Sequence, residues 1–215
     1  MKKQGKIFMR LIMFDMDGTL IDSGFAITNT INYVRVNLGL NKLEKNYILE
    51  KVNDPTINSA EFFYGTKEFT AQQTKLFEEY YNKHCLSDLV VYDGIAKLLE
   101  SLKDDFILTV ATNANSAYAH KMLNHVGLGH YFKTIIGYDN VKNPKPHPEM
   151  VNKTLDIHNI LKQNAQLIGD SHKDIMAASN AGIDSVLVNW GFSNHEKDAI
   201  ETIEELEKRI FEKFN

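Results

Sequence analysis

Short apolar runs alternate with longer segments of helical periodicity along most of this 215-residue chain. Such runs predict strands, and each is followed by apolar residues at helical spacing. Because strands that alternate with helices pair in parallel, the pattern predicts an α/β fold with a parallel sheet and helices on both faces. The charged tail, Glu201–Lys213, predicts an amphipathic helix. The predicted strands are Ile7–Phe14, Phe106–Ala111, Thr134–Ile136, Gln166–Gly169 and Ser185–Val188.

The segment after the first predicted strand breaks this alternation. Residues 22–92 contain no convincing buried strand, only helical stretches such as Ala26–Asn37 and Thr70–His84. The segment is too long for an ordinary connection, so it predicts an inserted helical domain. We expect residues 1–21 and 93–215 to form an α/β core domain and residues 22–92 to form a helical cap domain. A cap inserted there would lie above the carboxyl edge of the sheet, where α/β proteins bind ligands.

Composition and charge exclude several classes of function. The formal net charge is -4 at pH 7, so the basic surface of a nucleic-acid binder is missing. The only cysteine, Cys85, cannot form an intramolecular disulfide, which agrees with a reducing cytoplasm. Arg10, Asp15 and Asp17 interrupt the N-terminal apolar stretch, so we expect neither a membrane span nor a secretion signal. The expected protein is soluble and cytoplasmic, and its oligomeric state is open.

Two carboxylates one residue apart follow the first predicted strand, in the segment Phe14–Leu20 (FDMDGTL). Because alternate strand residues share a face, Asp15 and Asp17 can aim at one point beyond the carboxyl end of the strand. Gly18 permits a backbone conformation that a residue with a side chain resists. One carboxylate could attack phosphorus while the other handles the leaving-group proton, so the segment indicates phosphoryl transfer. A solvated turn is the alternative for this segment taken alone.

Two further predicted strands end in polar loops at the same edge of the sheet. Thr112 and Asn113 could hydrogen-bond phosphoryl oxygens, together with backbone N–H groups at the start of a helix expected from about Ser116. Helix capping is the alternative interpretation. Asp170 and Asp174 lie one helical turn apart and can approach the same ion, directly or through water. The alternative here is an N-cap followed by a first-turn acid.

A lysine lies in the proline-rich loop Asn143–Pro148 (NPKPHP). The prolines stiffen the backbone, so the Lys145 ammonium can be held in place at small entropic cost. It could offset charge on the nucleophile and on the phosphoryl group in the transition state. A proline-rich surface loop is the alternative. Lys142 competes for the role but lacks flanking prolines, and His147 is expected to cap or begin the next helix.

Four carboxylates in one cleft, Asp15, Asp17, Asp170 and Asp174, require a bound cation. Two carboxylates about 4 Å apart repel by roughly 4 kcal/mol at an effective dielectric constant of about 20, and four would repel several times as strongly. Oxygen ligands without a histidine or cysteine cluster favour a hard ion, and phosphate chemistry favours Mg²⁺ over Ca²⁺. The sequence therefore predicts a Mg²⁺ cofactor.

Four motifs occur in a fixed order over nearly the whole chain. They are Asp15-x-Asp17-Gly18-Thr19-Leu20, Thr112-Asn113, Lys145-Pro146 and Gly169-Asp170-Ser171-x-x-Asp174. In order and approximate spacing they resemble the haloacid dehalogenase-like (HAD) superfamily. The helical insert resembles the cap of its phosphoglycolate phosphatase-like and β-phosphoglucomutase-like branch, and the segments Ala177–Gly182 and Val188–Gly191 look most like the phosphatase side. Asp93-Gly94 and Pro144 depart from the commoner pattern without removing a catalytic group.

The resemblance implies a Rossmann-like core with a cap, and a role for each motif residue. It implies that Asp15 is the nucleophile that forms an aspartyl-phosphate. Asp17 would protonate the leaving alkoxide and then activate water. Thr112 and the Asn113 backbone would hold the phosphoryl oxygens, while Lys145 balances charge.

The resemblance also implies the ligands of the metal. Mg²⁺ would be bound by the carboxylates of Asp15 and Asp170 and by the backbone carbonyl of Asp17. Asp174 would order the surrounding shell, and water molecules would complete six positions. These roles favour a Mg²⁺-dependent phosphatase that acts on a small phosphorylated metabolite.

Three other functions are weighed against the phosphatase. A sugar phosphomutase uses the same core. Members of that branch resemble one another in having a cap histidine soon after the first motif, and Ser23–Thr30 contains no histidine. A dehalogenase releases a halide that needs no proton, so the acid at Asp17 argues against it. A catalytically silent binding module on the same fold is the remaining alternative, because fold does not fix function.

The sequence does not identify the substrate. Lys51, Asn53, Tyr64 and Lys67 in the insert are candidates to meet the leaving group, and solvent-facing helix positions are the alternative for each. Arg35 is the only arginine of the insert, so a bidentate clamp for the carboxylate of phosphoglycolate is not evident.

Overall fold

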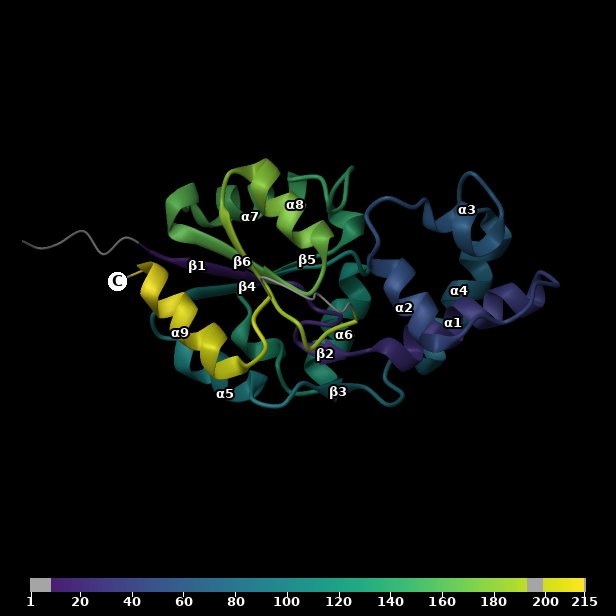
Figure 1. Cartoon of the computed structure of the whole chain (residues 1–215), viewed down its shortest axis with the longest axis horizontal. Coiled ribbons are helices and arrows are strands. Elements are labelled where there is room, and N and C mark those ends of the chain that lie inside the picture. The colour runs from purple at the N-terminus through teal and green to yellow at the C-terminus, as the bar shows by residue number, and fades with distance from the viewer. Residues whose placement is uncertain (1–8, 193–198, 215) are drawn as a thin grey trace, which may run out of the picture.

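A five-stranded parallel sheet lies at the centre of the protein (Figure 1). The structure is a computed structural model that describes residues 9–192 and 199–214. The strand order is β5-β4-β1-β6-β7, with β1 in the middle. This arrangement confirms the α/β fold class that the sequence predicts. The strands are β1 (Leu11–Phe14), β4 (Ile107–Ala111), β5 (Thr134–Ile136), β6 (Ala165–Gly169) and β7 (Asp184–Leu187).

Four of the five strands differ from their predicted bounds: β1 starts later, and β4, β6 and β7 differ by one residue at one or both ends. β1 begins at Leu11, and the predicted start at Ile7 lies outside the described residues. Phe106 precedes β4, and Val188 follows β7 and pairs only through an isolated bridge. Both side chains are buried without belonging to a strand. An apolar residue indicates a buried position. At the ends of strands, buried positions continue beyond the last hydrogen bond of the ladder, so the predicted bounds include residues that lie outside the strand.

Helices cover both faces of the sheet. Successive residues of β1 point to opposite sides, so β1 contributes side chains to a buried cluster on each face. Ile12 and Phe14 belong to one buried cluster, and Leu11 and Met13 belong to the other. Figure 1 shows the two helical layers on either side of the sheet. The first layer contains α5 (Ile95–Leu102), α6 (Ser116–His125) and α9 (Ile203–Phe214), and the second contains α7 (Glu149–His158) and α8 (His172–Ala181).

The segment 22–92 is helical, as expected, and packs around a buried cluster of its own. That cluster includes Val34, Ile48 and Phe63. Figure 1 shows these helices beyond the carboxyl edge of the sheet. The proposed division of the chain into core and cap rests on this arrangement. The helices are α1 (Gly24–Asn37), α2 (Lys45–Asn53), α3 (Ser59–Tyr64) and α4 (Ala71–His84).

A short antiparallel ribbon joins the insert to the rest of the chain. Its strands, β2 (Ile21–Asp22) and β3 (Val90–Val91), pair where the chain leaves the sheet region and where it returns. The sequence does not predict this ribbon, because two residues are too few to show a period-2 pattern.

The helices of the described residues are of moderate length. α1 and α4 have 14 residues each. In the part of the chain that the structure describes, no helix combines the length and the apolar character that crossing a membrane requires. The expected amphipathic tail is confirmed in α9, where Leu206, Ile210 and Phe214 are buried at spacings of four residues.

Candidate active site

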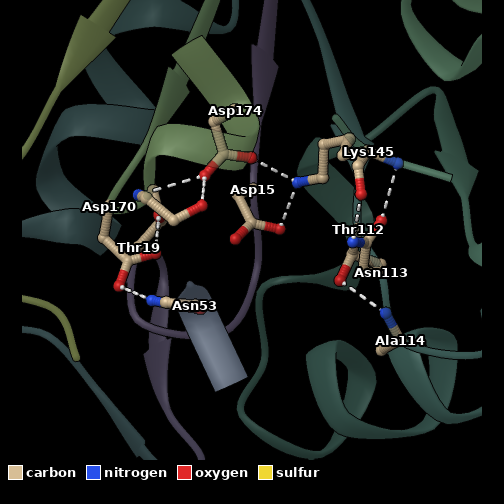
Figure 2. A network of polar contacts seen from close by, with 10 residues as sticks. Asp15, Thr19, Asn53, Thr112, Asn113, Ala114, Lys145, Asp170 and Asp174 are labelled. Carbon is tan, nitrogen blue, oxygen red and sulfur yellow. Dashed lines mark hydrogen bonds and ion pairs between the residues drawn. The ribbon is translucent and has the colours of Figure 1, made fainter. Parts of the chain in front are cut away.

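The carboxyl ends of neighbouring strands bring the predicted site residues together. β1 pairs with both β4 and β6, so the loops that follow these strands meet at one edge of the sheet. Asp15 follows β1, Thr112 follows β4 and Asp170 follows β6. Lys145 lies in the loop after β5, and Asp174 lies in the first turn of α8. Figure 2 shows Asp15, Lys145 and Asp174 pointing toward one another.

The Lys145 ammonium lies between two buried carboxylates (Figure 2). Its Nζ is 2.8 Å from Asp15 Oδ1 and 2.5 Å from Asp174 Oδ1. Burial lowers the pKa of Lys145, but attraction to the two carboxylates outweighs burial and raises that pKa above its ordinary value. Lys145 is therefore a cation at neutral pH. The competing candidate, Lys142, is exposed, and its backbone N–H is bound to Glu149.

Asn113 holds the loop that carries Lys145. Its side-chain Nδ2 donates to the Lys145 carbonyl at 2.8 Å, and its Oδ1 accepts from the Lys145 N–H at 3.0 Å. The Asn113 side chain is therefore used within the protein, and the phosphate contact implied for its backbone N–H stays a prediction. The Thr112 hydroxyl is buried and accepts from the Ala114 N–H at 3.1 Å. Helix capping, the alternative for this loop, is performed by Asn115 instead.

Three acids form a compact cluster of oxygen atoms. Asp15, Asp170 and Asp174 each place one carboxylate oxygen so that all three oxygens lie within 4.8 Å of one another, and all three residues are buried. Burial raises the pKa of Asp15 to about 7; Lys145 opposes this rise and Asp174 adds to it. Burial and repulsion from the other two acids raise the pKa of Asp170 well above its ordinary value. The cluster therefore fits a hard divalent cation, which would supply the missing positive charge.

Asp170 and Asp174 are held by different partners, although one motif contains both. Ser171 is the N-cap of α8, and Asp174 Oδ2 accepts from its hydroxyl at 2.6 Å and from its backbone N–H at 3.2 Å. The capping interpretation therefore applies to Ser171 and Asp174. Asp170 Oδ2 accepts from the Phe192 N–H at 2.9 Å and from Asn53 Nδ2, on the helical insert, at 3.0 Å.

Two glycines allow the backbone to pass close to Asp170. Gly18 has φ +82°, and a Cβ there would lie 2.3 Å from Asp170 Oδ2. A Cβ on Gly191 would lie 2.4 Å from the same oxygen. The expectation that Gly18 adopts a conformation unfavourable to other residues is confirmed, and the close approach gives it a second reason.

Asp17 is oriented by a residue that the sequence analysis did not single out. Its Oδ1 accepts a hydrogen bond from the Ser23 hydroxyl at the start of α1. Loss of hydration raises the pKa of Asp17 to about 6, while the Ser23 hydrogen bond and Lys145 oppose the rise. The Asp17 side chain is not part of the three-acid cluster, and the metal contact implied for its backbone carbonyl stays a prediction. A serine six residues from an acid carries no sequence pattern that could have identified it.

A cavity of about 590 Å³ lies between the sheet edge and the helical insert, a volume typical of ligand sites. Two of the four insert candidates, Asn53 and Tyr64, line it. Lys51 and Lys67 do not, and Lys51 instead pairs with acids on the insert. The motif residues in its wall are Asp15, Asp17, Thr112, Asn113, Lys145 and Ser171.

Comparison with known proteins identifies the family of the chain. A family model described as haloacid dehalogenase-like hydrolase matches residues 12–188. The chain belongs to this family. A phosphoglycolate phosphatase of Vibrio cholerae is 31% identical to this HAD-like hydrolase over 204 residues, covering 87% of this chain and 88% of the relative. A phosphoglycolate phosphatase of Aquifex aeolicus is 31% identical over 185 residues, covering 86% of each.

Solved structures agree with this membership. A structure described as a predicted phosphatase from Clostridium acetobutylicum is 28% identical, with a TM-score of 0.85, and the match covers 95% of the HAD-like hydrolase and 99% of that chain. A predicted phosphoglycolate phosphatase from Haemophilus somnus is 26% identical, with a TM-score of 0.71 over 88% of this chain and 89% of the other. The HAD-like hydrolase is thus an enzyme of the phosphatase type, a phosphoric monoester hydrolase.

Proposed function

We propose that this enzyme is a Mg²⁺-dependent phosphatase that hydrolyses a small phosphorylated metabolite through an aspartyl-phosphate at Asp15. The observation that carries the proposal is the meeting of three acid oxygens within 4.8 Å, with Lys145 bound to two of the acids. Asp15 and Lys145 also line the cavity, so a phosphate ester inside it can reach the cluster.

In the first half-reaction Asp15 is the nucleophile. A carboxylate oxygen of Asp15 attacks phosphorus, and the bond from phosphorus to the leaving oxygen breaks. Lys145, at 2.8 Å from Asp15 Oδ1, favours the ionised carboxylate against the effect of burial and orients it. Asp17 donates its proton to the leaving oxygen, so the substrate departs as an alcohol.

In the second half-reaction Asp17 acts as a base. Its carboxylate accepts a proton from water as the water oxygen attacks phosphorus, the bond from phosphorus to Asp15 breaks, and inorganic phosphate leaves. A pKa of about 6 suits both directions of proton transfer near neutral pH. Ser23, rather than a histidine of the insert, hydrogen-bonds Asp17, which supports a phosphatase over a phosphomutase.

The remaining residues bind the phosphoryl group and the cation. The Thr112 hydroxyl and the Asn113 backbone N–H would hold phosphoryl oxygens. Mg²⁺ would be held by the carboxylates of Asp15 and Asp170 and the Asp17 carbonyl, with Asp174 ordering the shell. When bound, the ion supplies positive charge that stabilises the phosphoryl oxygens and the ionised nucleophile.

Removing the metal should abolish activity. The purified chain is expected to release p-nitrophenol from p-nitrophenyl phosphate when Mg²⁺ is present, because the buried acids alone repel an anionic ester. EDTA should stop the reaction, and added Mg²⁺ should restore it. Unchanged turnover after exhaustive chelation would contradict the metal-dependent proposal, and no turnover under any condition would favour a binding module.

Asp17→Asn should slow both half-reactions, by about 10²–10⁴-fold in kcat for an alkyl phosphate, since general acid-base catalysis contributes on that scale. p-Nitrophenolate leaves without protonation, so with p-nitrophenyl phosphate the variant should show a rapid burst followed by slow turnover. Stopped-flow absorbance would measure the burst. An unchanged steady-state rate at neutral pH would mean that another group transfers the proton.

A further inference from the structure

Much of the cavity wall is apolar and aromatic. Six of its rings come from both sides of the cleft, from the helical insert and from the loops and helix beside the sheet edge. They are Phe63, Phe69, Phe77, Tyr81, Tyr118 and Tyr138.

Phe63 and Tyr81 are buried, and the exposed rings of this group are Phe69 and Tyr138. Phe77 stacks on Tyr81 with centroids 5.2 Å apart, and Tyr81 meets Tyr118 edge-on at 4.9 Å, so the row runs from α4 across the cleft to α6. Phe69 and Tyr138 remain 57% and 48% exposed although they line the cavity. Exposed rings at a cavity wall offer stacking and edge contacts to a bound ring.

Several polar side chains of the cavity wall are engaged within the protein. The Gln73 amide hydrogen-bonds the chain just before α4, as the N3 member of a capping box. Asn53 donates to Asp170, as Figure 2 shows. Lys173 Nζ donates to the Val52 carbonyl at 2.6 Å. Protein partners therefore already occupy these three groups, and Ser59, Thr74 and Glu78 also line the wall.

The charges in the cavity wall disfavour an anionic leaving group. Among the described lining residues, the cations are Lys145 and Lys173, and both are engaged by protein oxygens. Arg35 does not line the cavity; its guanidinium donates to the carbonyls of Asn41 and Phe63. Glu78, in contrast, is an exposed acid in the wall. A carboxylate on the leaving group would meet repulsion and would find no bidentate partner in the wall.

We propose that the leaving group of the substrate is uncharged and carries a flat ring, and that phosphoglycolate is a poor substrate. The inference rests on the proposed function, because it names the alcohol released at Asp15. A cavity of about 590 Å³ has room for a ring-sized group beside the phosphate. Contacts with that remote group can be used to position the ester for attack.

A panel of three alkyl phosphates tests the leaving group, because their alcohols need similar protonation. The esters are 2-phenylethyl phosphate, glucose 6-phosphate and phosphoglycolate, compared by kcat/KM with Mg²⁺. We expect the phenylethyl ester to exceed phosphoglycolate by about 10- to 100-fold, since two or three ring contacts are each worth about 2- to 12-fold. Equal or higher efficiency with phosphoglycolate or glucose 6-phosphate would overturn the proposal.

Paired variants locate the effect in the cavity. Glu78→Lys should raise kcat/KM for phosphoglycolate by about tenfold, because it replaces an anion in the wall with a cation. Glu79→Lys makes the same charge change at the next position of α4, which does not line the cavity, and should change it by less than about twofold. Equal effects of the two variants would mean that only the overall charge matters.

A second pair tests the rings. Phe69→Ala removes an exposed cavity ring and should lower kcat/KM for 2-phenylethyl phosphate by about tenfold, with little effect on phosphoglycolate. Phe25→Ala removes a ring that is 42% exposed and does not line the cavity, and should change neither value. Equal losses for both esters with Phe69→Ala would overturn the role of this ring.

Binding separates this inference from the proposed function. Calorimetric titration of the Asp15→Asn variant with Mg²⁺ needs no turnover, and 2-phenylethyl phosphate should bind at least about tenfold more tightly than phosphoglycolate. If p-nitrophenyl phosphate is never hydrolysed but this preference holds, the catalytic proposal fails while the ligand class stands. If hydrolysis occurs and the preference is absent or reversed, the catalytic proposal stands and the leaving-group inference fails.

Discussion

Asp15→Asn should lower kcat for p-nitrophenyl phosphate by at least about a thousandfold, because an amide cannot replace the attacking carboxylate. The substitution keeps the shape of the side chain, and the amide oxygen can still accept from Lys145, whose Nζ is 2.8 Å from Asp15 Oδ1. The fold should therefore persist. Steady-state turnover, together with labelling of the protein by radioactive phosphate from the substrate, measures both the rate and the covalent intermediate.

A matched control separates nucleophile loss from a general effect of removing one carboxylate. Asp156→Asn makes the same change at an exposed position of α7, away from the cavity, and should keep full activity. Thermal unfolding of both variants reports on the fold. Residual turnover clearly above about 0.1%, or phosphate label on the Asp15→Asn protein, would contradict the covalent role of Asp15.

Lys145→Met should be strongly destabilising, because it leaves Asp15 and Asp174 buried without their shared counter-ion. Breaking a buried ion pair by removing one partner costs about 3–5 kcal/mol in free energy of unfolding. For a chain of this size that corresponds to a fall in Tm of roughly 6–20 °C. Differential scanning fluorimetry in EDTA measures the effect without compensation by a metal. Turnover should also fall, since the nucleophile loses its positive partner.

Two further variants keep this prediction testable. Lys142→Met removes an exposed lysine of the same loop and should change the free energy of unfolding by less than about 0.5 kcal/mol. Lys145→Met combined with Asp174→Asn also removes one of the two buried carboxylates that the first substitution leaves without a counter-ion. The double variant should therefore be more stable than Lys145→Met alone. A Lys145→Met protein as stable as Lys142→Met would show that Lys145 does not neutralise the buried acids.

Much of the fold was predictable because buried strands leave a strong pattern. β1 is apolar along its whole length, since helices cover both of its faces, and β5 has the predicted bounds. In the central sheet the errors lie at strand ends, such as Phe106, which is buried beside β4 but outside its ladder. The β2–β3 ribbon was missed because its two-residue strands hold no periodicity.

The central residues of the candidate site were predictable for a topological reason. Parallel strands end at one edge, so polar residues directly after them meet there, as Asp15 and Asp170 do across the β1–β6 pair. Their partners were not predictable in the same way. Asn113 binds the backbone of Lys145 across 32 positions, and Asn53 reaches Asp170 across 117 positions. No local pattern marks either amide for its partner.

The sequence by itself determined the class of fold and which acids lie at the edge of the sheet, because burial periodicity and the position of acids after strands are both local properties of the chain. Only the tertiary structure decided what faces those acids. The aromatic wall of Phe69, Phe77 and Tyr118 and the acid Glu78 come from an insert and a helix that meet across a cleft. Which face of a helix lines a cavity depends on how two packed units dock, and that geometry arises from contacts distant in sequence.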